Sequence, residues 1–209
     1  MQFDPNCKKC SRLANFLDKV SQSNPDYHCR PVAPFGDMSP QFLIVGLAPG
    51  MHGANKTGRP FTGDYAGILL YETLSKFGFS SSPESISVKD GLQLFGVRIT
   101  NAVKCLPPEN KPTTSEIKQC NNYLATEIKE IKNKLIILAL GKIAHEAVLT
   151  SQQLTKNHFK FSHGARHIIS DQQILYDSYH CSRYNTQTKR LTETMFEDVF
   201  FKIKTEMEN

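Results

Sequence analysis

The sequence has no tryptophan, no long apolar run and no strong excess of one charge. No stretch approaches the roughly 18 apolar residues that a membrane-spanning helix requires, so we expect no membrane association. The first ten residues are polar and contain two cysteines, which is unlike a signal peptide. The 25 Lys and Arg against 20 Asp and Glu give a net charge of +5, which favours a polyanionic partner without proving one. These features argue against membrane and secreted proteins, and we expect a cytoplasmic monomer.

The length and the cysteine content bound the architecture further. A chain of 209 residues suffices for one domain with a sizeable core, so we expect a single domain over residues 1–209. Six cysteines are present, but the cytosol keeps thiols reduced, so a disulfide framework is not expected.

Apolar patterning predicts helices that alternate with short, continuously apolar strands. The predicted strands are 42–45, 97–100, 135–140 and 173–179, and the predicted helices are 11–20, 64–74, 113–131, 142–149 and 192–204. Within the second helix, Ile68, Leu69 and Leu70 are expected to supply the buried side. Such alternation indicates an α/β fold, a three-layer α/β/α sandwich around a short, mostly parallel four-stranded sheet. Ligands of such sheets bind beyond the carboxyl ends of the strands, which directs attention to residues 46–64, 101–105, 141–145 and 180–185.

A glycine-rich loop follows the first predicted strand. Residues 46–64 read G-L-A-P-G-M-H-G-A-N-K-T-G-R-P-F-T-G-D and contain five glycines, which allow close backbone approach to a ligand. Residues 50–57 nearly fit a phosphate-binding P-loop, but Asn55 stands where that motif has glycine. Gly58, Pro60 and Gly63 also break the helix that a P-loop must open. A nucleotide-binding protein is therefore an alternative that the motif does not favour.

Together with the segment H-C-S-R-Y-N-T-Q-T-K-R-L-T at residues 180–192, with Asn101 and with four cysteines, this loop resembles the family 5 iron–sulfur enzymes of the uracil-DNA glycosylase superfamily. The resemblance covers nearly the whole chain, although Cys181 replaces the proline usual in that family. It implies a DNA repair glycosylase that hydrolyses the N-glycosidic bond of uracil, and of other deaminated bases, to leave an abasic site. The implied partner is DNA containing uracil or other deaminated bases.

The resemblance implies a base-binding set of five residues. Its members are Gly46, Ala48, Phe61, Asn101 and His180. Phe61 would stack on the extruded base, the Asn101 amide would pair with its edge, and His180 would hydrogen-bond the uracil O2 as charge develops there. Without the resemblance, a core phenylalanine, a turn asparagine and a structural histidine are the ordinary interpretations of these residues.

The residue that positions the attacking water is left open by the sequence. Leu47 and Ala48 are apolar where related families carry a polar side chain, and the resemblance points instead to Asn55. We therefore predict Asn55 and His180 as catalytic residues, with His52 and Asp64 as other candidates for the water. Asp64 has a competing interpretation as the N-cap of the following helix.

Four cysteines are candidate metal ligands: Cys7 and Cys10 form a C-x2-C pair, and Cys105 and Cys120 a second, wider pair. Spacing alone leaves zinc and iron–sulfur chemistry open. The resemblance implies a structural [4Fe–4S] cluster bound by all four, with Cys29 and Cys181 as unligated thiols.

The segment after His180 combines charge, hydroxyl groups and an aromatic ring, which suits contact with DNA. The predicted DNA-binding residues are Ser182, Arg183, Tyr184, Lys189 and Arg190. Arg183 or Tyr184 would fill the gap left by the flipped base, although a basic loop can also be merely solvated. A non-catalytic iron–sulfur module that binds damaged DNA is the alternative function.

Overall fold

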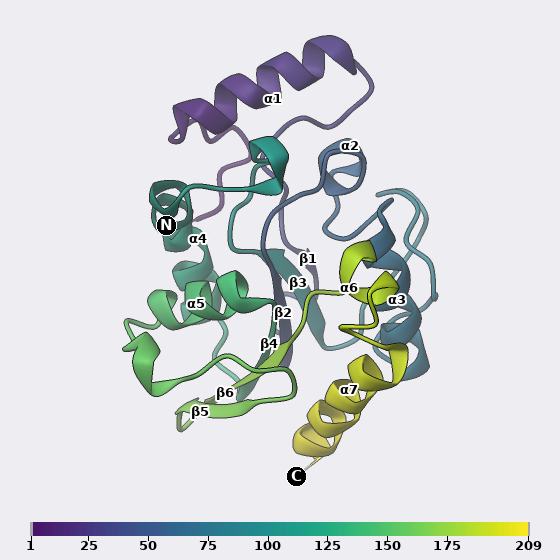
Figure 1. The fold of residues 1–209 in the computed structure, drawn as a ribbon, viewed down its shortest axis with the longest axis vertical. Coiled ribbons are helices and arrows are strands. Elements are labelled where there is room, and N and C mark those ends of the chain that lie inside the picture. Colours follow the sequence, from purple (N-terminus) through teal and green to yellow (C-terminus); the bar gives the residue numbers. More distant parts are fainter. Residues whose placement is uncertain (1, 209) are drawn as a thin grey trace.

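The computed structural model describes residues 2–208 as a mixed sheet covered by helices on both faces (Figure 1). The strands are β1 (Phe35–Gly36), β2 (Phe42–Gly46), β3 (Val97–Asn101), β4 (Leu135–Leu140), β5 (Arg166–Ser170) and β6 (Gln173–Ser178). The α-helices are α1 (Ser11–Ser23), α2 (Ala54–Thr57), α3 (Tyr65–Lys76), α4 (Thr114–Glu130), α5 (Lys142–Ser151), α6 (Arg183–Gln187) and α7 (Glu193–Glu208). Two short 3₁₀ turns complete the set, η1 (Pro108–Asn110) and η2 (Lys156–His158).

The predicted α/β class is confirmed, but the predicted strand number is wrong. The sheet has six strands in the order β1-β3-β2-β4-β6-β5. The four predicted strands form its parallel centre, and β1 and β5 add antiparallel edges. These edges escaped prediction because β1 has two residues inside a proline-rich segment, and because the sequence of β5 lacks a continuous apolar run.

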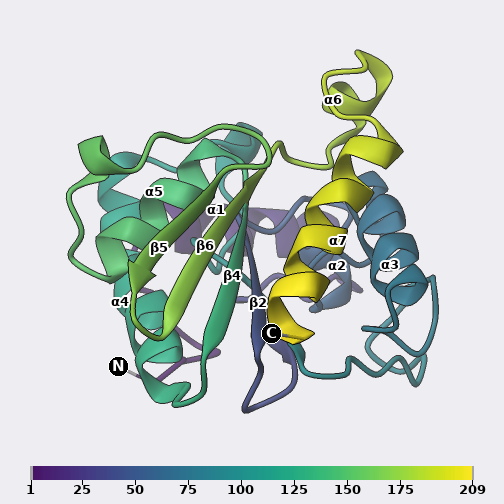
Figure 2. The same ribbon diagram turned by 90° about the horizontal axis from the view of Figure 1, so that it is seen from below.

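Alternate residues of the central strands face opposite helical layers. Phe42 and Ile44 of β2 point into the layer of α3 and α7, whereas Leu43 and Val45 point toward α4 and α5. Figure 2, which looks along the sheet, shows α7 and α3 on one side and α4 and α5 on the other. Burial on both faces explains why these strands are apolar at every position.

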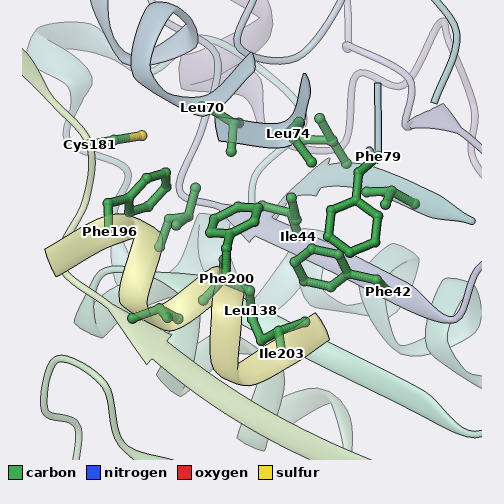
Figure 3. Close-up of a cluster of buried hydrophobic side chains, with 14 of the residues drawn as sticks. Phe42, Ile44, Leu70, Leu74, Phe79, Leu138, Cys181, Phe196, Phe200 and Ile203 are labelled. Carbon is green, nitrogen blue, oxygen red and sulfur yellow. The ribbon is translucent and has the colours of Figure 1, made fainter. Parts of the chain in front are cut away.

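Phenylalanine rings pack among aliphatic side chains in the core between the sheet and α7 (Figure 3). The ring of Phe42 packs edge-on against Phe79 at 5.5 Å and Phe200 at 5.7 Å, measured between ring centroids. Phe196 and Ile203 continue the same face of α7. This packing fixes β2, whose last residue opens the glycine-rich loop.

The helix starts agree with the capping signals of the sequence. The Asp64 carboxylate accepts a hydrogen bond from the Gly67 amide at 2.9 Å, and Thr113 with Glu116 forms a complete capping box on α4. One expectation for α3 is wrong: the Ile68 side chain is 54% exposed, because the helix turns Leu70 and Leu74 toward the core instead.

A separate apolar cluster attaches α1 to the rest of the molecule. Leu13, Leu17 and Val20 of this helix are buried with Val103 and Tyr123. The cluster joins α1 to the loop after β3 and to α4. Within residues 2–208, no helix combines the length and apolarity that crossing a bilayer demands.

Candidate active site

The carboxyl ends of β2 and β3 bring the glycine-rich loop beside Asn101. Parallel pairing places Gly46 opposite Asn101, each at the last position of its strand. His180 follows β6 by two residues, and a Cβ on Gly141, at the end of β4, would lie 3.7 Å from the Cβ of His180. The ends of these four neighbouring strands, β3, β2, β4 and β6, therefore lie at one edge of the sheet, as expected for a parallel sheet.

Gly46 provides the space in which Asn101 and Phe61 meet. A Cβ at this position would lie 2.4 Å from Oδ1 of Asn101 and 2.6 Å from Cζ of Phe61. Both distances are far below van der Waals contact, so only glycine accommodates these two side chains as they stand.

The Phe61 ring is held by its own backbone and by α3. Its φ of 52° lies in the left-handed region, which non-glycine residues seldom adopt. A Cβ on Gly67 would lie 1.9 Å from the Phe61 carbonyl oxygen, so that glycine allows the loop to press against the helix. The ring stacks beside His180, with centroids 5.9 Å apart and planes inclined by 29°.

Residues missed by the sequence analysis anchor this loop from beneath. The buried guanidinium of Arg59 donates to both oxygens of Asp90 at 2.9 Å. The Tyr71 hydroxyl donates to the Pro60 carbonyl at 3.0 Å, and burial raises the pKa of that hydroxyl to about 12. The R-P-F motif gave no indication of these partners because Asp90 lies 31 residues away in sequence.

A cavity of about 350 Å³ opens at this convergence of strand ends. Such a volume is at the lower end of small-molecule sites, which range over about 300–1,000 Å³. The predicted residues that line it are Ala48, Phe61, Asn101, His180, Ser182 and Arg183. Asp64, Tyr65 and Asn110 also line it. Asn110 carried no sequence signal, because it ends a short 3₁₀ turn in a proline-rich segment.

Asn101 offers the cavity an unused hydrogen-bonding atom. Its side chain is 4% exposed, and no group within residues 2–208 hydrogen-bonds to its Oδ1. A buried acceptor without a partner costs about 1–3 kcal/mol of folding free energy. An acceptor placed in this way at a cavity wall suits a ligand that brings an N–H donor.

His180 is electrically neutral in this setting. Burial lowers the pKa of its imidazole to about 4, so the ring carries no charge at neutral pH. The Asn185 amide donates to the His180 carbonyl oxygen at 2.8 Å and so fixes the backbone that carries the ring. A neutral imidazole has one N–H with which it can donate to a ligand oxygen.

The three water-positioning candidates occupy different places. Asn55 is fully buried on α2, its Nδ2 lies 3.5 Å from Sγ of Cys29, and its Oδ1 has no partner within residues 2–208. Asn55 is not among the cavity-lining residues. His52 bonds to the Tyr27 hydroxyl at 2.9 Å, outside the cavity. Asp64 lines the cavity while it caps α3, and burial raises the pKa of its carboxyl group.

The predicted DNA-binding residues cluster around α6, which projects from the sheet in Figure 2. Ser182 caps this short helix, and the Arg183 guanidinium lies 5.8 Å from the centre of the Tyr65 ring. Tyr184 is 71% exposed, whereas the Arg190 guanidinium rests over Tyr179 at 4.8 Å. Lys189 lies in the turn that follows, and its side chain is exposed. These residues form one rim of the cavity and the surface beyond it.

The four predicted ligand cysteines lie together at a second, separate cavity. Cys7 and Cys10 precede α1, Cys105 follows β3, and Cys120 belongs to α4; all four line one small cavity. Burial, with the neighbouring thiols as a smaller cause, raises the pKa of Cys105 to about 12. The two remaining cysteines lie outside this group, and Cys181 is fully buried in the main core.

Comparison with known proteins gives this geometry a family. The model of the "Uracil DNA glycosylase superfamily" matches residues 33–204. The fold is also similar to a crystal structure of wild-type SMUG2 from Pedobacter heparinus, with a TM-score of 0.50 and 14% identity over 82% of this chain and 77% of that one. The chain therefore belongs to the uracil-DNA glycosylase superfamily.

Closer relatives narrow the assignment within the superfamily. A type-5 uracil-DNA glycosylase from Thermus thermophilus is 43% identical over 203 residues, which cover 95% of this chain and 92% of that protein. The type-5 enzyme from Pyrobaculum aerophilum is 39% identical over 198 residues, or 92% and 85%. The chain is a member of the type-5 family, which confirms the resemblance seen in its motifs.

Proposed function

We propose that this protein, as a type-5 DNA repair glycosylase, releases uracil from DNA at the cavity between Phe61, Asn101 and His180. The reaction hydrolyses the bond between the base and the sugar C1′ and leaves an abasic site. The observation that carries the proposal is the convergence of an aromatic face, an unpaired amide oxygen and a neutral imidazole on one cavity. Uracil requires these three groups for stacking, edge recognition and stabilisation of the leaving base.

Base recognition follows from the positions of these groups. The extruded base enters the cavity and stacks on Phe61, while Asn101 Oδ1 accepts its N3–H and the amide N–H₂ donates to the adjacent carbonyl. Negative charge grows on the base as the glycosidic bond breaks, and His180 donates an N–H to the uracil O2. Leu47 and Ala48 are apolar and commit the cavity to no particular exocyclic group, so we propose that other deaminated bases, hypoxanthine among them, are also substrates.

Two residues compete for the attacking water. Asn55 retains an unpaired buried oxygen that can orient water, although its side chain lies behind the cavity wall. Asp64 lines the cavity, and its carboxylate can accept a hydrogen bond from water while it caps α3. We propose Asn55 as the water-positioning residue and Asp64 as the alternative. An oxocarbenium-like sugar needs only a weak nucleophile, so neither residue must remove a proton before bond cleavage.

The α6 region is the proposed DNA surface. Ser182, Arg183, Lys189 and Arg190 can contact phosphates on either side of the flipped nucleotide. Tyr184 is the most exposed aromatic ring there and has the shape to fill the vacated stack, with Arg183 as the alternative wedge.

We further propose that Cys7, Cys10, Cys105 and Cys120 hold a [4Fe–4S] cluster. Four thiolates around a tetrahedral zinc ion would lie about 3.8 Å apart, given Zn–S bonds of about 2.3 Å. Among residues 2–208, the potential ligand atoms that all lie within 4.8 Å of one another belong to His145, His167 and Asp177, not to these cysteines. The wider spacing suits a larger group with one thiolate on each iron. A bound cation would also reverse the effect of burial on the thiol pKa values.

The proposed role of the cluster is structural. The ligands come from the segment before α1, the loop after β3 and α4, so the cluster would fasten α1 to the sheet. Iron and acid-labile sulfide analysis of the purified protein tests this assignment. Four irons and four sulfides per chain support it, and one zinc with no sulfide contradicts it.

Base release from a uracil-containing oligonucleotide, followed by alkaline cleavage of the abasic strand, tests the activity. Strand cleavage that depends on both Asn101 and His180 supports the proposal. Tight binding with uncut strands at high protein excess would favour the alternative, a module that recognises damaged DNA without catalysis. Asn55→Ala and Asp64→Asn, measured in the same assay, identify the residue that positions water. A monomeric state and a cytoplasmic location stay predictions from the sequence.

A further inference from the structure

A second group of polar side chains is buried behind the sheet, away from the catalytic cavity. His145 of α5, His167 of β5 and Asp177 of β6 offer ligand atoms that all lie within 4.8 Å of one another. None of the three lines the cavity that holds Asn101 and His180. Figure 2 shows α5 next to the β5–β6 edge, where these elements meet.

Strand alternation explains why the group forms. Leu175 of β6 faces the layer of α4 and α5, and Asp177, two residues later, faces the same way. Its fully buried carboxylate lies 2.7 Å from Nδ1 of His145 and 3.1 Å from Nε2 of His167. A buried carboxylate requires a compensating positive charge.

The hydrogen bond on the far side of His145 determines what this charge can be. Nε2 of His145 lies 3.0 Å from the Phe159 carbonyl oxygen, which can only accept, so Nε2 carries a hydrogen. In the neutral imidazole, Nδ1 is then a bare lone pair directed at a carboxylate oxygen 2.7 Å away. Two lone pairs repel at this distance, so a proton or a metal ion must lie between them. The 2.7 Å separation is that of a hydrogen bond, and a zinc ion with bonds of about 2.0 Å to both atoms would move them to about 3.3 Å apart.

Three features favour a metal ion. A proton bridges two atoms, whereas three donors of the kinds that bind zinc converge here. The N–H to a backbone carbonyl is the outer contact that orients histidine ligands in metal sites. The rings of Phe161 and Phe159 pack against His145 and His167 respectively, and a cavity of about 420 Å³ that His145 helps to line gives access from outside.

We propose that His145, His167 and Asp177 form a binding site for one divalent transition-metal ion, with zinc as the matching ion. Nδ1 of His145, Nε2 of His167 and a carboxylate oxygen of Asp177 supply three ligands, and the adjacent cavity can supply a water as the fourth. The ion would tie α5 to the β5–β6 edge. The site is separate from the proposed catalytic cavity and from the four cysteines, so it does not depend on either assignment.

Isothermal titration calorimetry, with zinc added to the chelator-treated holoprotein, tests the site. We expect one zinc per chain, and at least about 100-fold weaker binding in His167→Gln, since loss of even an outer-shell partner weakens metal sites about 10–100-fold. His167 lies on an edge strand, so glutamine there is compatible with the fold. His158→Gln is the matched control, because His158 is an exposed histidine nearby, and its affinity should equal that of the unmodified protein.

Cobalt substitution provides a second measurement in the unmodified protein. A tetrahedral d–d spectrum without thiolate charge transfer would support nitrogen and oxygen ligation at this site and exclude the cysteines. The proposal is overturned if no zinc or cobalt binds, if the spectrum shows only thiolate ligation, or if folded His167→Gln binds zinc as tightly as the control. In each of these cases the 2.7 Å contact between His145 and Asp177 is a hydrogen bond, and the three residues hold no metal ion.

Discussion

Two histidines near the carboxyl edge of the sheet differ in how their hydrogen bonds are used. Both nitrogens of His145 are engaged, one by Asp177 and one by the Phe159 carbonyl. His180 has no hydrogen-bond partner for its ring within residues 2–208, and burial lowers its pKa to about 4. The first arrangement turns both ring nitrogens toward groups of the protein itself, where the proposed metal ion would tie α5 to the β5–β6 edge. The second leaves polar atoms open toward a cavity, which is what a ligand-binding group requires.

Two buried asparagines repeat this contrast. Asn121 of α4 donates through Nδ2 to the Ala147 carbonyl at 2.8 Å and so links α4 to α5. Asn101 keeps its Oδ1 unpaired at the cavity wall. Burial alone therefore does not distinguish these two asparagines, whereas unsatisfied hydrogen-bonding capacity does.

The largest effect is expected on the rate of uracil release, which should distinguish Asn101 from Asn121. Asn101→Ala and His180→Ala are each expected to lower the rate of uracil release about 10²–10³-fold, since each removes a group that stabilises the departing base. Asn121→Ala should keep the rate but lower the free energy of unfolding by about 1–3 kcal/mol. Single-turnover assays and denaturant unfolding measure the two quantities. Normal turnover in both of the first two variants would overturn the site assignment.

Gly46→Ala should disturb the geometry of the catalytic cavity without removing any polar group. The added methyl would overlap both Asn101 Oδ1 and the Phe61 ring, and a displacement of about 1 Å can cost about 100-fold in rate. Gly78→Ala is the strain control, because Gly78 has a φ of 79° and open space around its Cα. It should lower stability slightly and leave the rate of base release unchanged. Equal rates of base release in Gly46→Ala and the unmodified enzyme would show that catalysis does not depend on the positions that Asn101 and Phe61 adopt beside Gly46.

Proton binding should distinguish His180 from ordinary histidines. Because burial lowers its pKa to about 4, the unfolded chain binds a proton that the folded chain rejects between about pH 6.5 and 4. The contribution of His180 to stability is therefore complete above about pH 6.5 and is lost as pH falls through that window. NMR titration of the His180 ring should show no inflection near pH 6.5. An inflection there would contradict the lowered pKa of this imidazole.

The smallest effect on the rate of base release is expected at the exposed residues beyond the rim of the catalytic cavity. Replacing Lys189 and Arg190 together by alanine should weaken DNA binding for all sequences alike. The slope of log affinity against log salt should become shallower by about 1 for each phosphate that these side chains no longer neutralise. The rate of base release at saturating DNA should be nearly unchanged. Fluorescence anisotropy at several salt concentrations measures the slope, and an unchanged slope would indicate that these side chains are merely solvated.

Part of the fold could be predicted from the sequence alone. The four central strands were predictable because burial on both faces makes every position apolar, and Asp64 and Thr113 marked their helix starts by capping chemistry. The edge strands and the outward turn of Ile68 depend on tertiary packing that a local pattern does not contain.

For the site, the motifs indicated Phe61, Asn101 and His180, which the fold brings to one cavity. They did not indicate Tyr65 or Asn110, since lining a cavity leaves no mark on neighbouring sequence. They also indicated Asn55, which the structure buries outside the residues that line the cavity. The group of His145, His167 and Asp177 was invisible for a related reason, because strand pairing and helix packing alone bring these distant residues together.

The left-handed backbone at Phe61 has a further consequence. Gly67 lets α3 approach the Phe61 carbonyl oxygen closely, and the Arg59–Asp90 ion pair and the Tyr71–Pro60 hydrogen bond anchor the two preceding residues. Phe61 is therefore held in place before any nucleotide arrives. Docking a base then requires little loss of protein conformational entropy, so binding energy goes mainly into unstacking the DNA. Substitution of Asp90, which does not line the cavity, should consequently weaken the binding of the extruded base.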